Sequence, residues 1–176
     1  GVHAGENGHN PIDFVRAQTP AGEALAIYSS AQALSAHRPG DRPMALDFRT
    51  IGLTALVETG GRIVVNPGTD AVLLPRPAVA ALAQGDEWLP AWRDDALREL
   101  LLAEASAACP AIVDMGIVYA GDGLTRVVVS VDRARFAQGE DASSTKDELS
   151  AALNAVGAHP RLKASADRVE IVPVLR

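Results

Sequence analysis

The sequence predicts an α+β fold, a mixed α/β structure of two linked subdomains in which helices pack on a mixed sheet. Segments with a helical spacing of apolar residues alternate with short strand-like segments along the 176 residues. Turns rich in glycine and proline join several strands as hairpins, which a purely parallel sheet does not contain. We expect subdomains at residues 11–87 and 95–176, linked by a joint at 88–94, because both halves show this pattern. Residues 1–10 are polar and glycine-rich, which predicts a flexible tail.

The first subdomain is expected to open with a β-hairpin. Residues 12–16 and 25–28 have strand-like apolar patterns, and a Thr-Pro-Ala-Gly turn lies between them. Ser29 or Ser30 then takes the place of a helix N-cap, because a serine hydroxyl there accepts a free backbone N–H of the first turn. The alanine-rich helix that follows is expected to end before Pro39.

The segment after this helix is less regular. Residues 44–48, with the sequence MALDF, are predicted to form a short strand. Residues 49–59 place apolar side chains at mixed helical intervals, so we expect a helix that the following pair of glycines ends. Gly52 lowers the helix propensity of this segment by about 1 kcal/mol relative to alanine.

A second hairpin is predicted in the sequence RIVVNPGTDAVLLP. Residues 63–65 are β-branched throughout, as in a buried strand, and residues 72–74 form the return strand. Pro67 fixes φ at the first central position of the turn, and Gly68 accepts a positive φ at the second. Asn66 is expected to bond to its own backbone two residues further on.

Two helices are predicted on either side of the joint. The first has Pro77 in its first turn and Gly85 as its C-cap. The second begins at Asp94 or Asp95 and ends at Cys109, where a proline follows. Its single apolar stripe consists of Leu97, Leu100, Leu101, Ala105 and Ala108.

A third hairpin is predicted in the second subdomain. It pairs residues 111–120 with 125–132 across a Gly-Asp-Gly turn. An exposed charged loop at 133–145 follows it.

The chain is then expected to end with a helix and a strand. The helix starts with a capping box, formed either by Ser144 with Asp147 or by Thr145 with Glu148. Its core stripe consists of Leu149, Leu153 and Val156. Pro173 interrupts the last strand, which favours an edge position in the sheet.

Four stretches of the chain, taken in order, resemble the SseB family of enhanced serine sensitivity proteins, especially the forms of high-GC Gram-positive bacteria. They are ALAIYSSAQALSAH, IVVNPGTDAVLLPRPAVAALAQG, EWLPAW and ALRELLLAEASAACPAIVDMGIVYAGDGLTRVVVSVD. The resemblance runs from about Ala24 to the end and implies a bacterial protein with a mixed α/β structure in two linked subdomains. It supplies no catalytic residues. The chain departs from the family at its front, where an additional helix and a strand ending in Val-Pro are usual.

The composition argues against several function classes. The formal net charge is −6, which repels nucleic-acid phosphates, and aromatic residues make up only 4%, too few for a base-stacking platform. A single cysteine excludes an internal disulfide, and no apolar run approaches the ~20 residues of a membrane span. We therefore expect a cytoplasmic protein that binds neither nucleic acid nor membrane. The four histidines show no ligand spacing, so we expect no metal and no cofactor.

Two groups of residues are candidates for binding a ligand or a partner. The turn residues Asn66, Gly68, Thr69 and Asp70 could form an anion-binding nest, but Asp70 would repel an anion, and a tight hairpin turn accounts for these residues without a ligand. The tryptophans of the joint, Trp88 and Trp92, could be an exposed anchor for a partner, because tryptophan is enriched in interface hot spots. Packing between the subdomains is the alternative for this pair.

Other chemistry-bearing residues have structural interpretations. Cys109 lies at the negative end of a predicted helix, which does not favour a reactive thiolate, so we expect a buried cysteine. Ser29 and Ser30 lack a nucleophile-elbow motif. A run of charges is expected to be a solvated turn, and it consists of Asp132, Arg133, Arg135, Glu140 and Asp141.

Two hypotheses about function follow. The first is a non-enzymatic interaction or adaptor protein of the SseB type, with a protein partner or a second copy of itself. The second is a small-ligand protein or enzyme, for example for an amino acid, with a cleft between the halves near residues 66–70 and 88–92.

Overall fold

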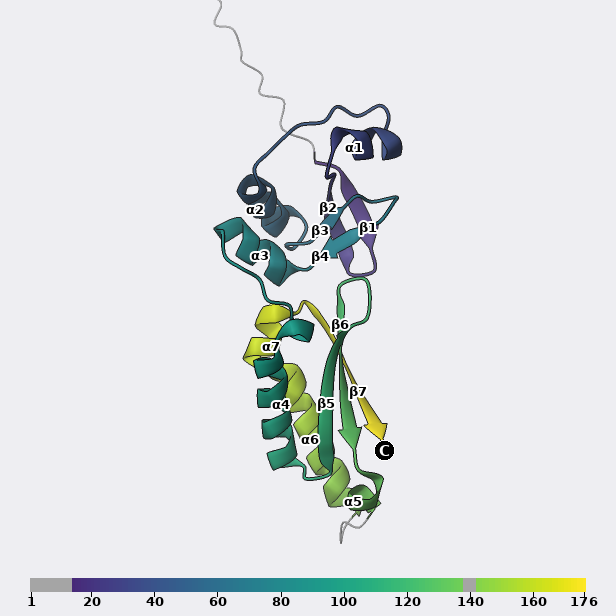
Figure 1. Ribbon diagram of the computed structural model, residues 1–176, viewed down its shortest axis with the longest axis vertical. Coiled ribbons are helices and arrows are strands. Elements are labelled where there is room, and N and C mark those ends of the chain that lie inside the picture. Colours follow the sequence, from purple (N-terminus) through teal and green to yellow (C-terminus); the bar gives the residue numbers. More distant parts are fainter. Residues whose placement is uncertain (1–13, 138–141) are drawn as a thin grey trace, which may run out of the picture.

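The computed structural model describes residues 14–137 and 142–176, and shows two lobes stacked end to end along one long axis (Figure 1). The first lobe is built on a four-stranded sheet and the second on a three-stranded sheet. Each sheet contains both parallel and antiparallel pairs, and helices pack on it. The predicted α+β class is confirmed. The predicted tail at residues 1–10 lies outside the described residues.

The first sheet has the strand order β1-β2-β3-β4. Its strands are β1 (Arg16–Thr19), β2 (Gly22–Ile27), β3 (Ile63–Val65) and β4 (Val72–Leu74). The two outer pairs are the predicted hairpins and are antiparallel, whereas the central pair, β2 with β3, is parallel. The chain connects these central strands through α1 (Ala31–His37) and α2 (Phe48–Glu58). Their carboxyl ends therefore lie side by side at one end of the sheet.

Two helices cover one face of this sheet. These are α2 and α3 (Arg76–Gln84), and the core beneath them contains Leu25, Ala55, Ile63 and Val79, all fully buried. A Cβ placed on Gly52 would lie 2.7 Å from the Cβ of Ala83, so the missing side chain lets the two helices approach. Glycine at this position thus serves packing rather than a turn.

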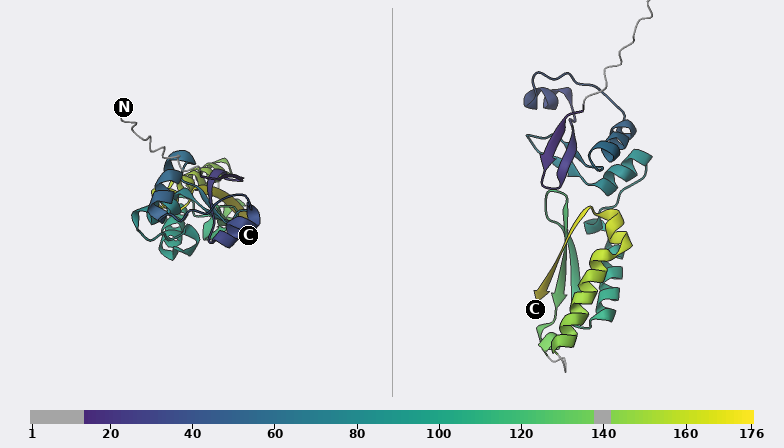
Figure 2. Two further views of the ribbon diagram at one scale, coloured as in Figure 1. Left: turned by 90° about the horizontal axis from the view of Figure 1, so that it is seen from above. Right: turned by 180° about the vertical axis from the view of Figure 1, so that it is seen from behind.

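The second sheet has the order β5-β6-β7, with an antiparallel pair β5 (Ile112–Tyr119) and β6 (Leu124–Val131) and a parallel partner β7 (Arg168–Leu175). The long helices α4 (Asp95–Ala108) and α6 (Ala142–Ala158) lie on the same face of it (Figure 2). Shorter elements complete the lobe: η1 (Ala91–Arg93), α5 (Arg133–Ala137) and α7 (Pro160–Ser165). Strand β7, which carries Pro173, is at the edge as predicted.

Several predicted local features are confirmed. Ser30 Oγ accepts the backbone N–H of Ala33 and caps α1. Asp94 caps α4 by accepting the N–H of Leu97, and Gly85 ends α3 with a left-handed φ of 81°. Leu97, Leu101 and Ala105 are buried in the stripe of α4.

Other local predictions are wrong. Residues 44–48 form no strand, because Asp47 caps α2 by accepting the N–H of Thr50. Residues 133–137 of the predicted loop are the helix α5, whose first N–H groups bond to Asp132. Helix α6 begins at Ala142, so Ser144 and Thr145 lie within the helix and form no capping box at its start. The short helix α7 was not expected from the sequence. No helix among residues 14–137 and 142–176 is long and apolar enough to cross a membrane.

Candidate functional site

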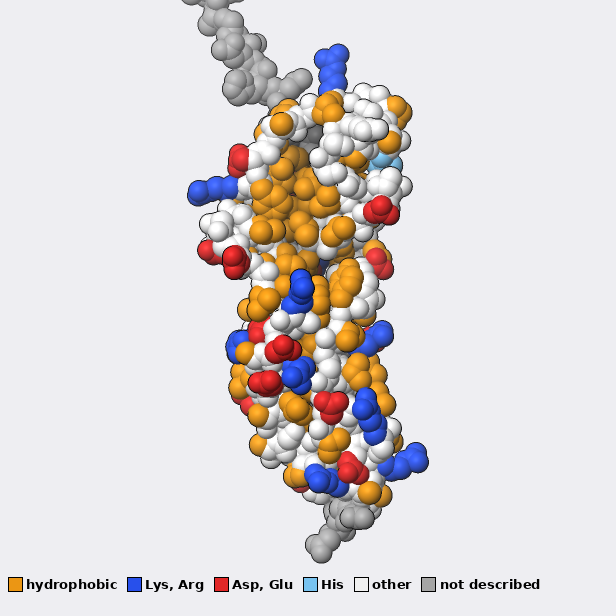
Figure 3. Space-filling model, viewed as in Figure 1, with side chains coloured by type: hydrophobic (Ala, Val, Ile, Leu, Met, Phe, Trp, Pro, Cys, Tyr) orange, Lys and Arg blue, Asp and Glu red, His pale blue; other side chains and the backbone are white. Residues whose placement is uncertain are grey.

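A hollow of about 1030 Å³ lies in the first lobe, beyond the end of β2. Residues 38–46, here called the strap, connect α1 to α2 (Figure 1), and all of them except Pro39 line the hollow. Much of its lining is apolar and comes from Phe14, Ile27, Leu34, Met44, Leu46 and Ile51. In the space-filling view the same lobe shows a broad hydrophobic surface that is hollowed near its upper end (Figure 3). The hollow is therefore a depression with a mixed apolar and polar lining, spanned by a segment without regular secondary structure.

Charged side chains line the hollow unevenly. Arg16 donates hydrogen bonds to Glu23 and Glu58, at 3.3 and 3.0 Å, so its charge is balanced from outside the hollow. Arg38 forms an ion pair with Asp41 within the strap, and this contact raises the pKa of the Arg38 guanidinium. Arg42 lines the hollow and forms no ion pair with the described residues.

The hydroxyl groups of the lining already have partners. Tyr28 Oη and His37 Nδ1 are hydrogen-bonded at 2.8 Å, and partial burial raises the pKa of Tyr28. Ser30 Oγ caps α1. Ser29 is held by Asn66, whose Nδ2 donates to Ser29 Oγ at 3.0 Å. The polar wall of the hollow is thus a pre-formed network.

The sequence predicted that the side chain of Asn66 bonds to its own turn, and this prediction is wrong. Its Oδ1 accepts the backbone N–H of Ser29 at 2.9 Å, which ties β3 to the end of β2. Its carbonyl accepts the N–H of Thr69 at 3.3 Å and closes the turn. Asn66 therefore touches the hollow only through Ser29, and the other candidate residues of the turn do not line it.

The rest of the turn packs against α1. Gly68 has a φ of +92°, and a Cβ there would lie 2.5 Å from the imidazole Cδ2 of His37. Thr69 and Asp70 are exposed, and Thr69 Oγ1 donates to the carbonyl of Asn66. The hairpin prediction is confirmed, and every residue at its tip has a structural explanation.

The two tryptophans lie at the junction of the lobes. Their rings meet edge to face with centroids 5.8 Å apart, and the ring of Trp92 lies 4.9 Å from that of Tyr119 on β5. Trp88 Nε1 donates to the carbonyl of Ser165 at 3.2 Å. Both tryptophans are partly buried, and Trp92 packs against the core of the second lobe. Among the described residues, no hydrogen bond or aromatic contact joins these tryptophans to the Asn66 turn.

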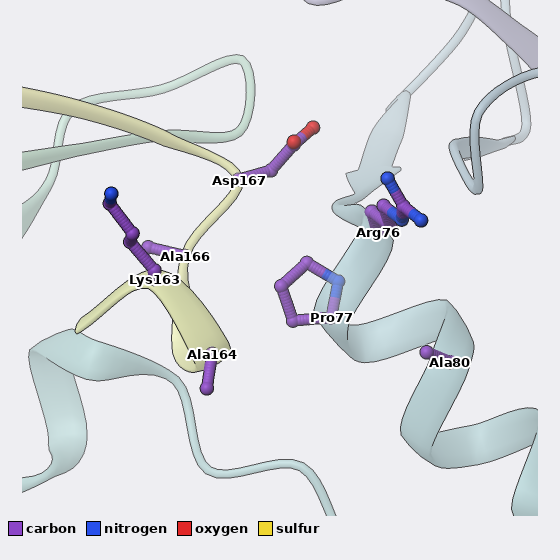
Figure 4. A pocket seen from close by; sticks show the side chains of 7 residues that line it. All are labelled: Arg76, Pro77, Ala80, Lys163, Ala164, Ala166 and Asp167. Atoms are coloured by element: carbon purple, nitrogen blue, oxygen red, sulfur yellow. The ribbon is translucent and has the colours of Figure 1, made fainter. Parts of the chain in front are cut away.

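A second hollow, of about 510 Å³, lies between the lobes. Figure 4 shows Arg76, Pro77 and Ala80 of α3 across from Lys163 and Asp167, at the end of α7 and beyond it. Asp167 is engaged by Arg62, whose Nε donates to Asp167 Oδ2 at 2.7 Å. Neither the Asn66 turn nor the tryptophans line this hollow.

The remaining chemistry-bearing residues occupy structural positions. Cys109 is fully buried at the C-terminal end of α4, and its N–H donates to the carbonyl of Ala105. Asp132 accepts backbone N–H groups at the start of α5, and the other acids of that predicted charged loop, Glu140 and Asp141, lie outside the described residues. Within the described part of the chain, no three His, Cys, Asp or Glu residues gather as metal ligands.

Sequence reasoning missed the residues that form the hollow. Arg42 lies in a segment without any predicted element, Met44 was expected in a short strand, and Tyr28 was expected at the end of a strand, so none of the three was a candidate for a site. Asn66 was the one candidate residue of the sequence that is connected to the hollow. Its side chain forms hydrogen bonds with Ser29, which lines the hollow.

Comparison with known proteins gives one match. Residues 2–81 match the family described as the SseB protein N-terminal domain. This segment begins before the resemblance seen in the sequence and covers the sheet of the first lobe. The curated proteins contain no match to the chain, and the solved structures contain none either. The family match thus identifies residues 2–81 as similar to the N-terminal domain of SseB proteins, and it does not extend to the second lobe.

Proposed function

We propose that this chain is a non-enzymatic protein-interaction module that docks a protein partner on the solvent-facing side of α2. The observation that carries the proposal is the exposure of two apolar side chains there. Leu53 is 50% exposed and Val57 is 86% exposed. They are four residues apart and therefore lie on the same side of the helix, one turn from each other.

Helix α2 is apolar on its inner side as well. Gly52 and Ala55 are buried on that side. Apolar side chains thus lie on the outer side of α2 as well as on its inner side, and an exposed apolar patch of this kind supports a partner that covers it. Helix α3, which packs against α2, adds Leu82 at 42% exposure. Single exposed leucines are common, but neighbouring ones on packed helices are typical of an interaction surface.

The charge beside this surface suggests the chemistry of the partner. Arg49 precedes Leu53 by one helical turn and is exposed. A partner with an apolar groove and an acidic side chain at its rim would bury Leu53 and Val57 and pair with Arg49.

The proposal of a non-enzymatic role rests on the structural roles of three side chains that could otherwise take part in catalysis. Asp167 is paired with Arg62, Ser30 caps a helix and Cys109 is buried. Catalysis by nucleophile and base needs such groups within hydrogen-bond reach of each other, and these three lie on separate elements.

Site-specific photocrosslinking tests the proposal. A photoreactive phenylalanine derivative replaces Val57 in one variant and Glu99, an exposed residue of α4, in a control variant. Irradiation in an extract of the source cells is expected to give a discrete crosslinked product from position 57 and none from position 99. A product of twice the chain mass from the purified protein would identify a second copy as the partner.

A paired charge variant completes the test. Leu53→Asp with Val57→Asp is expected to leave the fold intact, because both side chains are exposed, and to abolish the product formed from a crosslinker at position 82. The proposal fails if position 57 yields no product, or yields the same products as position 99.

A further inference from the structure

We infer that the hollow under the strap binds a small molecule that combines one carboxylate group with an apolar body. This site is separate from the α2 surface of the proposed function, since it lies beyond the carboxyl end of β2. Leu53 and Val57 do not line it.

The position of the hollow in the sheet is the first argument. In open sheets with parallel strands, ligands bind outside the carboxyl ends of neighbouring strands. Here β2 and β3 are the only parallel pair described in the first lobe, and the hollow lies beyond β2 where Tyr28 and Ser29 follow it. A volume of about 1030 Å³ is at the upper end of the range found for small-molecule sites.

The apolar lining is the second argument. Phe14, Ile27 and Ile51 are only partly buried, although they pack on the core that contains Leu25. On the opposite side Met44 of the strap is 62% exposed. A ligand with an apolar body would cover these side chains from both sides, which removes apolar surface from water.

The charge of the lining is the third argument. The whole chain has a formal net charge of −6, yet the lining contains Arg16, Arg38 and Arg42 against the single acid Asp41. Arg42 is the arginine of this set without an ion pair to a described residue. Among the described residues, this guanidinium has no acidic partner and matches one carboxylate through two parallel hydrogen bonds. A doubly charged phosphate would place its second charge near Asp41, and the described lining offers no second unpaired cation for it.

The engaged hydroxyls restrict the rest of the ligand. Tyr28 is bonded to His37, Ser29 to Asn66, and Ser30 to the backbone of α1. A sugar or nucleotide would compete with these bonds for the hydroxyl groups of Tyr28 and Ser29. This network therefore favours a body without polar groups.

Methionine-methyl NMR tests the inference with octanoate as the probe. The chain contains two methionines, Met44 in the lining of the hollow and Met115 buried in the second lobe. With ¹³C-methyl methionine, octanoate is expected to shift the Met44 signal saturably and to leave the Met115 signal in place. Octanol and octylammonium, which have the same chain without the negative charge, are expected to bind at least fivefold more weakly.

Two arginine variants locate the charge effect. Arg42→Ala is expected to weaken octanoate binding at least fivefold, and Arg93→Ala, which removes an exposed arginine outside the hollow, is expected to leave it unchanged. The inference is overturned if Met44 does not respond, if octanol binds as well as octanoate, or if both variants bind alike. Loss of crosslinking at Val57 has no bearing on these outcomes, so the two proposals fail separately.

Discussion

Arg62 and Asp167 are 105 positions apart in the chain, yet Arg62 Nε donates to Asp167 Oδ2 at 2.7 Å. Arg62 precedes β3 in the first lobe, and Asp167 lies between α7 and β7 in the second. The side chains are 25% and 15% exposed, so the ion pair is largely shielded from water. Together with the bond from Trp88 to Ser165, it fastens the lobes to each other.

Removing Arg62 is expected to loosen this junction. Arg62→Ala leaves the shielded carboxylate of Asp167 without its partner, which costs about 1–3 kcal/mol. Urea unfolding measures the change in free energy, and small-angle X-ray scattering measures the separation of the lobes. Arg126→Ala removes a pair with Glu170 whose side chains are 43% and 46% exposed, so it is the matched control and should cost less than about 1 kcal/mol. Equal losses in the two variants would contradict a special role for the Arg62 pair.

Gly52→Ala is expected to destabilise the chain although alanine is the better helix former. The new Cβ would lie 2.7 Å from the Cβ of Ala83, so α2 and α3 must separate. Overpacking of this kind costs roughly 1–3 kcal/mol, more than the helix-propensity gain of about 1 kcal/mol. Thermal unfolding of Gly52→Ala, Ala83→Gly and the double variant checks this. The double variant should regain part of the loss, and a stabilised single variant would refute the argument.

Asp94 both caps α4 and forms an ion pair, and two substitutions distinguish the contributions of these two interactions to stability. Asp94 Oδ1 accepts the N–H of Leu97, while Oδ2 accepts a hydrogen bond from Arg161 at 3.0 Å. Asn is as good an N-cap as Asp, so Asp94→Asn should lose only the pair with the half-exposed Arg161. Asp94→Ala should lose about 1 kcal/mol more. Chemical denaturation of both variants measures the difference, and equal stabilities would show that the cap contributes nothing.

The cap of α2 is expected to make part of the stability pH-dependent. Hydrogen bonds from the hydroxyl and the backbone N–H of Thr50 lower the pKa of Asp47 below its ordinary 3.8. A lowered folded-state pKa means that this contribution is present above pH 3.8 and is lost as the pH falls through the folded pKa. NMR titration of the carboxyl carbon in the native chain and in Thr50→Ala measures it. The pKa should rise in the variant, and an unchanged value would exclude the Thr50 hydroxyl as a cause.

The turn at Asn66 shows which features the local sequence predicts and which it does not. Pro67 and Gly68 set the backbone of the turn, and the hairpin forms as they predict. The side chain of Asn66 goes elsewhere, because the parallel pairing of β2 with β3 brings the N–H of Ser29 within 2.9 Å of its Oδ1. A residue 37 positions away in the chain cannot be identified as a partner from the turn sequence.

The sequence by itself determined the features that depend on neighbours within a few residues: the α+β class, the hairpins, the cap at Gly85 and the edge position of β7. It narrowed two N-caps to adjacent pairs of residues, of which the structure selects Ser30 and Asp94. Spacing of apolar residues and turn chemistry act over that range, so they can be read directly. Only the tertiary structure decided the hollow under the strap and the ion pair of Arg62 with Asp167. Both arise where segments far apart in the chain meet, and such meetings depend on how whole layers pack rather than on any local pattern of residues.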